Sequence, residues 1–427
     1  MTVTGEHVEA PAPPRTPGDL MSRAQRLRLV LVLGSLIAIG PLTIDMYLPA
    51  LPSIATDFET PSAAVQLTLT GTLAGLAFGQ LLIGPFSDAV GRRTPLLAGL
   101  ALHIVASALC VIAPNIGVLG TLRVLQGLGV AATSVVGMAV VRDLFSGSEF
   151  ARMLSRLMLV MGAAPVLAPT LGSELLRWTQ WQGVFVALAI FGLLLITVAA
   201  LGLPETLPPR RRRRGGALDT ARTYGGLLRD RTFLGLVLVA GLAMAALFAY
   251  VSGSSFVFQE QYGLNEQEFG FAFGAGAIGL ITATQLNVRL LRRYSPQRIL
   301  VTALVVGSLA GFALLGFAVT NYGGLPGILA SLWVVLAASG LAMPNAPALA
   351  LSRHGEAAGT AAALLGAVQF GVGAVAAPLV GVLGNGSVGM ALVVVGGMVS
   401  ALTVLVVVVR PARLPTADLA VATAALH

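Results

Sequence analysis

The sequence predicts an all-α integral membrane protein with twelve transmembrane helices in two six-helix bundles. The first observation is composition, since 56% of the 427 residues are apolar and only 10% are charged, with a mean hydropathy of +0.87. A soluble domain is usually about 25% charged. This chain could not cover its surface with polar groups, so a soluble globular protein is excluded. The other two observations are the length of the apolar segments and the placement of the arginines.

Twelve apolar segments follow one another along the chain. A membrane-spanning helix needs roughly 20 apolar residues, and each segment is long enough. The 51 glycines and 23 prolines sit inside these runs, as membrane helices tolerate. The first run is too long for a signal peptide and is interpreted as an uncleaved helix. The segments are 28–51, 63–86, 94–113, 116–140, 151–174, 182–203, 232–256, 268–290, 298–319, 325–348, 357–383 and 388–409.

The arginines fix the predicted orientation. All 26 basic residues are arginine, against 18 acidic residues. If the N-terminus is inside, all but two arginines fall in the tails, in the inner gaps or at their borders; the exceptions are Arg177 outside and Arg123 within a segment. Positive charge concentrates on the cytoplasmic side of membrane proteins. We therefore expect both termini in the cytoplasm, and a lipid bilayer rather than nucleic acid as the partner of this basic chain.

The longest polar interruption divides the chain into two halves. It is centred on the five arginines 210–214, and six apolar segments lie on each side. The halves also echo one another, because Pro169-Thr170-Leu171-Gly172 resembles Pro378-Leu379-Val380-Gly381. Parallel six-helix repeats are typical of one transporter class, with the substrate site between them. The expected regions are a cytoplasmic tail 1–26, a bundle 27–205, a basic linker 206–231, a bundle 232–410 and a cytoplasmic tail 411–427.

Two ionisable residues are predicted to lie deep in the membrane. Asp45 falls in the first segment, between Pro41 and Pro49, and Arg123 in the fourth. A charge at the bilayer centre costs about 2.5–3.5 kcal/mol on insertion scales, and arginine must pair or face water because it keeps its proton. Asp45 is therefore the natural partner of Arg123, directly or through water. Two interpretations stay open: a proton or cationic-substrate site, and a structural pair with a carboxylate that pins a kinked helix.

The connection between segments two and three is predicted to be a conformational latch on the inner side. Its two glycines permit a tight turn, its aspartate can cap a nearby helix N-terminus, and its arginines can anchor to headgroups. Charges at the end of segment four can extend this into a network. A plain anchored turn is the alternative. The residues assigned to the latch are Gly84, Asp88, Gly91, Arg92, Arg93, Arg142 and Asp143.

Segment five and several scattered polar or aromatic residues complete the candidates. Gly162, Pro165, Pro169 and Gly172 combine close helix contact with bends, which indicates either packing or a gating role. His103 is interpreted as a hydrogen-bonded interhelical residue, with a proton relay as the alternative, and Glu205 as the mark of the end of segment six. Aromatic residues at helical spacing are often core, but they can also line a pocket. The candidate substrate-binding residues are Tyr47, Gln126, Tyr250, Phe256 and Gln369.

These motifs together resemble the major facilitator superfamily, and within it the twelve-helix drug:proton antiporters. Residues 84–93 look like the signature loop of that family, Arg123-Val124-Leu125-Gln126-Gly127 like its fourth-span motif, and 165–172 like its antiporter motif. Residues 45–52, 141–145, 248–253 and 358–363 look like the bicyclomycin/chloramphenicol-resistance (Bcr/CflA) group. Ala89 and Phe86 depart from the usual signature loop, which has a basic residue and a leucine there.

The resemblance implies a proton-coupled exporter of small hydrophobic antibiotics, phenicol-like or bicyclomycin-like, in the bacterial cytoplasmic membrane. Asp45 would titrate with the transported proton, Arg123 would tune it, and the protein would function as a monomer. A proton-coupled transporter of a native metabolite is the alternative. We expect no enzyme, no cofactor and no metal site: a phosphate-binding loop needs a lysine, the chain has only four histidines and one cysteine, Cys110, and a channel filter motif is missing.

Overall fold

The structure is a computed structural model that describes residues 21–212, 217–354 and 357–411. Most of the two predicted tails (1–20 and 412–427) and residues 213–216 of the predicted linker, with Arg213 and Arg214, lie outside the described residues. Among the described residues, twelve helical segments are long and apolar enough to cross a membrane, and each overlaps one of the twelve predicted segments. The predicted all-α, twelve-span architecture is confirmed.

The first bundle contains six spans, of which the first is built from one long and two short consecutive helices. Its helices are α1 (Arg23–Asp45), η2 (Leu48–Ala50), α2 (Leu51–Asp57), α3 (Ser62–Val90), α4 (Arg93–Val111), α5 (Ile116–Leu144), α6 (Gly147–Leu176) and α7 (Gln182–Gly202). A short turn, η3 (Pro209–Arg211), and α8 (Ala217–Arg229) follow in the predicted linker.

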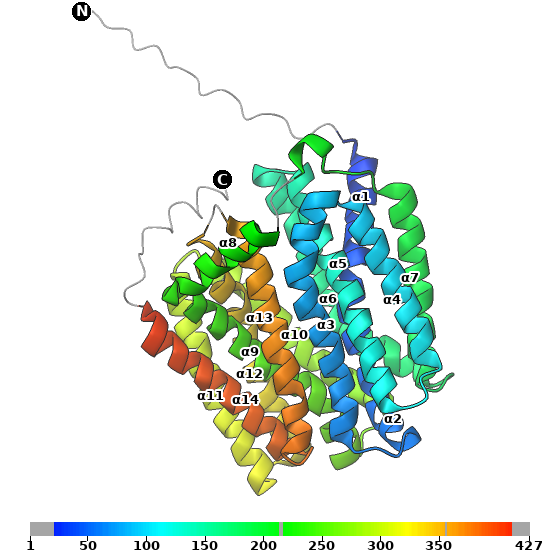
Figure 1. Ribbon diagram of the computed structural model, residues 1–427. Coiled ribbons are helices and arrows are strands. Elements are labelled where there is room, and N and C mark those ends of the chain that lie inside the picture. The colour runs from blue at the N-terminus through cyan, green and yellow to red at the C-terminus, as the bar shows by residue number, and fades with distance from the viewer. Residues whose placement is uncertain (1–20, 213–216, 355–356, 412–427) are drawn as a thin grey trace, which may run out of the picture.

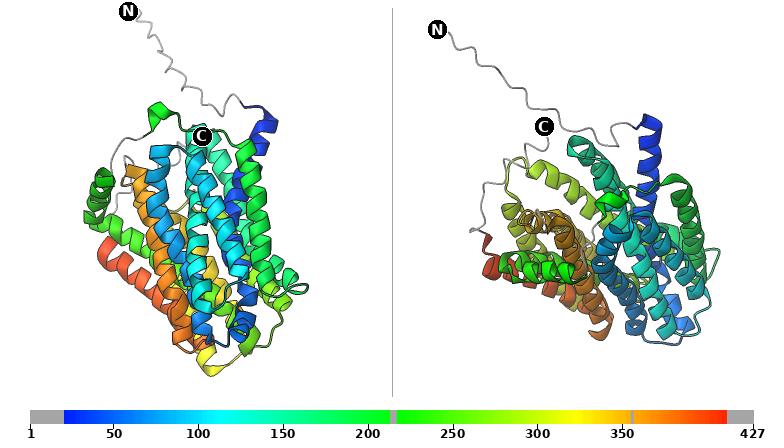
Figure 2. Two further views of the ribbon diagram at one scale, coloured as in Figure 1. Left: turned by 45° about the vertical axis from the view of Figure 1, so that its right-hand side comes forward. Right: turned by 45° about the horizontal axis from the view of Figure 1, so that its top comes forward.

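The second bundle repeats the same plan. Its helices are α9 (Arg231–Phe256) with its π-helical end η4 (Val257–Gln261), α10 (Glu266–Leu290), α11 (Pro296–Thr320), α12 (Gly324–Leu351), α13 (Ala358–Val382), and α14 (Ser387–Val404) with its π-helical end η6 (Leu405–Val409). Figure 1 shows the two bundles next to one another, with α3 of the first and α13 of the second packed together at their boundary. Two turned views show the same pairing (Figure 2).

Glycines let helices approach closely inside the first bundle. A Cβ atom added to Gly75 of α3 would strike the carbonyl oxygen of Val124 in α5, and one added to Gly127 of α5 would strike the carbonyl oxygen of Thr72 in α3. Small residues at such contacts are how membrane helices pack without a hydrophobic driving force. This contact fixes α5, and with it Arg123, against the rest of the bundle.

The first span is broken where the sequence predicts a single kinked helix. The α-helix stops at Asp45, and the chain turns at Met46 and Tyr47 before η2 begins. Pro49 has no N–H to donate to the carbonyl of Asp45, four residues earlier, and its ring disfavours helical backbone in the preceding residue. The proline therefore ends the helix beside the buried carboxylate instead of only bending it.

The two ends of the molecule differ in charge. We call the end that carries α8 and the start of α1 the arginine-rich end (top of Figure 1), and the opposite end the arginine-poor end. Hydrogen bonds between the two bundles gather in the half near the arginine-poor end. They run from Gln66 to Asn385 (2.8 Å), Thr70 to the Ala374 carbonyl (2.9 Å), Ser255 to the Leu48 carbonyl (2.7 Å), Gln259 to the Pro49 carbonyl (3.3 Å) and Ser173 to the Glu266 carbonyl (2.7 Å).

The arginine-rich end is joined differently. There, the Tyr224 hydroxyl of α8 donates to the carbonyl of Leu81 in α3 at 3.3 Å, so the linker helix touches the first bundle. The described structure is thus closed by direct hydrogen bonds between bundles at its arginine-poor end, and bridged by the linker at its arginine-rich end.

Candidate functional site

Asp45 lies at the interface between the two bundles. It is the last residue of α1, and only 6% of its surface is exposed. Among the described residues, none makes a hydrogen bond or an ion pair with its carboxylate. Tyr250 of α9, in the second bundle, is close enough to interact with it electrostatically. A buried carboxylate without a partner is costly when charged. Whether Asp45 is protonated therefore depends on the groups that both bundles place around it.

Arg123 is fully buried inside the first bundle and holds the broken end of α1. Its Nη1 and Nη2 atoms donate to the Thr43 carbonyl at 3.0 and 3.1 Å, and Nη1 also donates to Oε1 of Gln126 at 2.8 Å. Its guanidinium carbon lies 4.4 Å from the centroid of the Tyr47 ring and 5.7 Å from that of Phe185. The last carbonyls of a helix have no helical donors, and an aromatic face attracts a cation. Arg123 therefore stabilises the break in the first span.

Of the two pairings expected for Asp45 and Arg123, the direct one is not present, and the one through water stays a prediction. No ion pair joins the two side chains in the described part of the chain. Because the helix ends at Asp45, the Thr43 carbonyl is free to accept from the guanidinium, and this carbonyl takes the place of the carboxylate. The two residues are linked instead through the backbone of the last turn of α1.

A buried polar chain continues from Arg123 towards α4. Gln126 donates through Nε2 to the Ser107 hydroxyl at 2.7 Å, and Ser107 donates to the His103 carbonyl at 2.7 Å. Tyr47 is held on the other side by a 2.9 Å hydrogen bond with the Thr68 hydroxyl. These contacts fix the position of the guanidinium and the ring beneath it.

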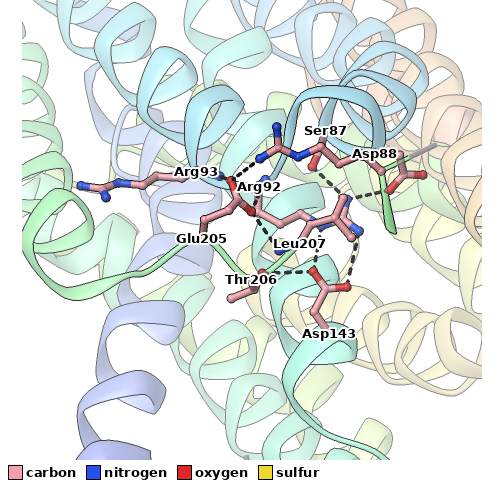
Figure 3. Close-up of polar contacts among 9 residues, drawn as sticks. Ser87, Asp88, Arg92, Arg93, Asp143, Glu205, Thr206 and Leu207 are labelled. Atoms are coloured by element: carbon pink, nitrogen blue, oxygen red, sulfur yellow. Dashed lines mark hydrogen bonds and ion pairs between the residues drawn. The ribbon is translucent and has the colours of Figure 1, made fainter. Parts of the chain in front are cut away.

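The predicted latch contains an ion-pair network at the arginine-rich end (Figure 3). The Arg92 guanidinium donates to Asp88 at 2.6 Å, to Asp143 at 2.9 Å and to the Ser87 hydroxyl at 3.0 Å. Burial alone would lower the pKa of Arg92, but the hydrogen bonds to Asp143 and Asp88 outweigh burial and raise its pKa above the usual value. Arg92 thereby ties the ends of α3 and α5 to the start of α4.

Glu205, which follows α7, is a further member of this network. Its carboxylate accepts from the backbone N–H groups of Arg92 (2.9 Å), Arg93 (3.3 Å) and Leu207 (2.9 Å). Burial alone would raise the pKa of Glu205, but these N–H groups and the nearby Arg212 hold it below the usual value. Gly91, with φ of +107°, allows the approach, because a Cβ atom there would strike the carboxylate. The network thus joins four of the six spans of the first bundle.

The second bundle has a smaller charged cluster at the same end. Asp230 caps α9 by accepting from the N–H groups of Thr232 and Phe233, and its other oxygen accepts from Arg353 at 3.2 Å and lies 3.1 Å from Nε2 of His354. Burial alone would raise the pKa of Asp230, but these hydrogen bonds lower it. The cluster joins the start of α9 to the residues that follow α12.

The predicted antiporter motif on α6 lies between the broken span and the second bundle. Pro165 and Pro169 are inside the helix, and a Cβ atom added to Gly172 would strike the carbonyl oxygen of Met46. A Cβ atom added to Gly162 would lie 3.6 Å from the nearest atom of Ile281 in α10, which is an ordinary contact distance. Gly172 is therefore the residue that lets α6 close over the break next to Asp45.

A family model described as "Major Facilitator Superfamily" matches residues 31–378. The chain belongs to the major facilitator superfamily. This match covers most of both bundles, and it makes the protein a transporter of small molecules across a lipid bilayer and not an enzyme. Among the described residues of this major facilitator protein, no group of three or more His, Cys, Asp or Glu residues could hold a metal ion.

Three curated bacterial relatives resemble this major facilitator protein over most of their length. The uncharacterized MFS-type transporter YdgK of Bacillus subtilis is 38% identical over 84% of this chain and 89% of that protein. The bicyclomycin resistance protein homolog of Haemophilus influenzae is 32% identical over 82% and 88%. Multidrug resistance protein MdtL of Escherichia coli is 30% identical over 66% and 71%.

Solved structures share the fold. A D-xylose-proton symporter has a TM-score of 0.70 and 16% identity over 90% of this chain and 97% of its own. A bacterial homolog of the human lysosomal transporter Spinster, in an inward-facing and occupied conformation, has a TM-score of 0.69 and 16% identity over 92% and 97%. At these identities the likeness extends to the fold alone.

The predicted substrate-binding residues of this major facilitator protein do not form one open pocket. Tyr47 and Gln126 are fully buried around Arg123, and Phe256 is 1% exposed in the second bundle. Gln369 is half-buried on α13, without a described hydrogen-bond partner. Their role in binding stays a prediction.

Tyr250 lies beside a small cavity in the second bundle. Its ring stacks on Phe273 with the centroids 4.9 Å apart, and its hydroxyl donates to the Phe273 carbonyl at 3.3 Å. The cavity, of about 70 Å³, is also lined by Gly276 of α10 and Trp333 of α12. Tyr250 is the one predicted substrate residue that borders this cavity.

Two other expectations differ from the structure. Gly84 lies inside α3 rather than in a turn, because the helix continues to Val90; only Gly91 of the pair has positive φ. Arg142 is exposed and makes no described contact, so it does not extend the latch. His103 is fully buried, and its ring lies close to the backbone of Gln126 in α5. Its interpretation as a hydrogen-bonded interhelical residue stays a prediction.

Proposed function

We propose that the protein is a proton-coupled antiporter that exports small hydrophobic antibiotics of the phenicol or bicyclomycin type. The observation that carries the proposal is Asp45, a buried carboxylate without a described partner at a helix break between the bundles. The printed names of the Haemophilus and Escherichia relatives concern bicyclomycin and multidrug resistance. They support the drug as cargo, and Asp45 supports the proton as counter-ion.

Protonation of Asp45 would be coupled to movement through the break in the first span. The carbonyls of Leu48 and Pro49, just beyond the break, accept hydrogen bonds from Ser255 and Gln259 of the second bundle. A negative charge on Asp45 would require water or a charged partner nearby, so the ionised form favours an open, hydrated cavity. The protonated form is compatible with the closed arrangement. The proton therefore biases the equilibrium between two states of the interface.

Arg123 has a positioning role in this scheme. By holding the Thr43 carbonyl, it fixes the last turn of α1 and thus the location of the carboxylate. Its buried charge lies against that turn from α5. The latch residues around Arg92 and Glu205 would stabilise the first bundle at its cytoplasmic face during the same transition.

The substrate would bind between the bundles, against the aromatic residues of the second bundle. Tyr250 and Trp333 border the small cavity and add one hydroxyl and one indole N–H to an otherwise apolar lining, which suits a largely apolar drug better than a sugar. Because positive charge marks the cytoplasmic side, the arginine-rich end is assigned to the cytoplasm. The described conformation, closed at its arginine-poor end, then corresponds to an inward-facing state of a monomer in the bacterial cytoplasmic membrane.

Two measurements test the proposal. A pump-deficient bacterium that expresses the protein should become less sensitive to phenicols or bicyclomycin, whereas Asp45→Asn should restore sensitivity at equal membrane abundance. Purified wild-type protein should release protons when drug is added, and Asp45→Asn should not. Unchanged sensitivity to a broad panel, despite correct insertion, would instead favour a native metabolite as cargo. Proton release by the Asp45→Asn variant would place the carrier elsewhere.

A further inference from the structure

A groove separates the first turns of α1 and α6 at the arginine-rich end. Each helix contributes residues spaced three, four and seven positions apart, so one face of each helix lines the groove. Its volume is about 510 Å³. The lining residues are Arg23, Arg26, Leu27 and Val30 of α1, Phe145 before α6, and Glu149, Arg152, Met153 and Arg156 of α6.

The groove holds more positive charge than its own residues neutralise. Arg26 and Arg152 both approach the same oxygen of Glu149, at 3.4 and 2.7 Å. Arg23 and Arg156 have no described partner. Four guanidinium groups thus surround one carboxylate, at the N-terminal ends of two helices whose dipoles add further positive potential. The site is suited to an anion.

The rest of the lining is apolar, which favours an anion that also carries apolar groups. Leu27, Val30, Phe145 and Met153 line the groove together with the arginines, and Leu27 is 60% exposed. A free phosphate would gain nothing from these walls. A phospholipid would place its phosphodiester among the guanidinium groups and its acyl chains against the apolar side chains. Basic pockets of this kind, at the cytoplasmic ends of membrane helices, suit anionic headgroups.

We propose that this α1–α6 groove is a binding site for one anionic phospholipid of the phosphatidylglycerol type. The proposal does not depend on what the protein transports. Arg23 and Arg156 would contact the phosphate, because they are free to do so without breaking an ion pair. Glu149 would limit affinity, because it competes with the phosphate for Arg26 and Arg152.

The test uses the purified full-length protein in a neutral detergent, with lipid adducts counted by native mass spectrometry. The probes are dioctanoyl phosphatidylglycerol and dioctanoyl phosphatidylcholine. The double variant Arg23→Gln/Arg156→Gln should bind the anionic lipid about thirtyfold more weakly than wild type, as expected for the loss of two arginine charges that contact the headgroup. The matched control, Arg289→Gln/Arg293→Gln, removes two exposed arginines from the second bundle and should bind like wild type.

A gain-of-binding variant protects the test against a folding defect. Glu149→Gln should bind phosphatidylglycerol more tightly than wild type, because the competing carboxylate is gone. Equal binding by wild type and the Arg23/Arg156 double variant would overturn the proposal, as would equal affinity for the zwitterionic lipid. Displacement of the lipid by millimolar inorganic phosphate would also overturn it and assign the groove to a soluble anion.

Discussion

The guanidinium of Arg123 donates two hydrogen bonds to the main-chain carbonyl of Thr43, two residues before the buried carboxylate of Asp45. A charged side chain on α5 therefore completes the end of α1. The contact depends on the planar shape of arginine, because the same group lies over the ring of Tyr47. Lysine is a point charge without this fork.

The variant Arg123→Lys keeps the charge but should destabilise the fold. We expect the free energy of unfolding to fall by about 1–3 kcal/mol, the usual cost of leaving a buried polar group without its partner. Unfolding of the purified protein in detergent measures this loss. Arg142→Lys is the control, because Arg142 is exposed and makes no described contact. Equal stability of the two variants would contradict a role for the fork geometry.

Gly162 and Gly172, the first and last residues of the motif on α6, should differ in their tolerance of alanine. Gly172→Ala places a methyl group against the Met46 carbonyl and must move α6 or the break in the first span, whereas Gly162→Ala meets Ile281 at ordinary distance. Overpacking costs about 1–3 kcal/mol. Gly172→Ala should therefore lower both the unfolding temperature and transport, and Gly162→Ala should change neither. Normal behaviour of Gly172→Ala would mean that the helices do not meet this closely.

Hydropathy and charge placement were sufficient to predict the fold, because each span is long enough to cross the bilayer and all but two of the arginines lie in the tails or at the gaps of one side. The same signals placed Asp45 and Arg123 inside the membrane. They could not predict the partner of Arg123, since a carbonyl freed by a helix break has no distinct residue type. The break itself follows from Pro49, but whether a proline bends or ends a helix depends on which groups capture the freed carbonyls.

Glu205 shows a second limit of sequence reasoning. It is 113 residues away from Arg92 in the sequence, yet its carboxylate accepts a hydrogen bond from the backbone N–H of Arg92. The sequence indicates only that Glu205 and Arg92 lie in gaps on the same predicted side of the membrane, and several gaps share that side. Only the packing of α3, α4, α5 and α7 selects which of them meet. For the same reason the cluster of Asp230, Arg353 and His354 was not predicted.

Glu205 should make stability depend on pH in the acid range. Its pKa is held below the usual 4.5 in the folded protein, so the folded state favours the ionised form. The resulting stabilisation is fully present above pH 4.5 and is lost as pH falls from 4.5 through the folded pKa. Unfolding temperature measured from pH 7 down to pH 3 should thus fall less steeply in Glu205→Gln than in wild type. Parallel curves would contradict this contribution; Glu174→Gln, on an exposed ion pair, serves as the control.

The linker helix α8 should be accessible only from the cytoplasm. Gly226 has open space around it, and Tyr322 is 76% exposed at the arginine-poor end. In a Cys110→Ser background, a membrane-impermeant maleimide added to intact cells should label Tyr322→Cys but not Gly226→Cys. Permeabilised cells should label both. Labelling of Gly226→Cys from outside would invert or overturn the assigned topology.

The hydrogen bond between Gln66 and Asn385 should help to keep the arginine-poor end closed. Gln66 is fully buried, and its amide nitrogen donates to Asn385 at 2.8 Å and to the Ser252 carbonyl at 3.4 Å. Asn385 has positive φ, so Gln66→Leu is the cleaner change. Losing a hydrogen bond worth about 0.5–1.5 kcal/mol in the closed state should raise the ratio of open to closed molecules by about two- to twelvefold.

Distances between spin labels report this shift directly. Labels at Thr56→Cys in α2 and Glu260→Cys in η4, both exposed residues of the arginine-poor end, should show a larger population at long distance in Gln66→Leu than in the parent protein. Thr320→Ala, which removes only local hydrogen bonds at the end of α11, to the Gly316 carbonyl and from the Tyr322 N–H, should leave the distribution unchanged. If Gln66→Leu matches this control, then closure rests on the carbonyls of Leu48 and Pro49 beside the break in the first span, and Ser255→Ala becomes the variant that opens it.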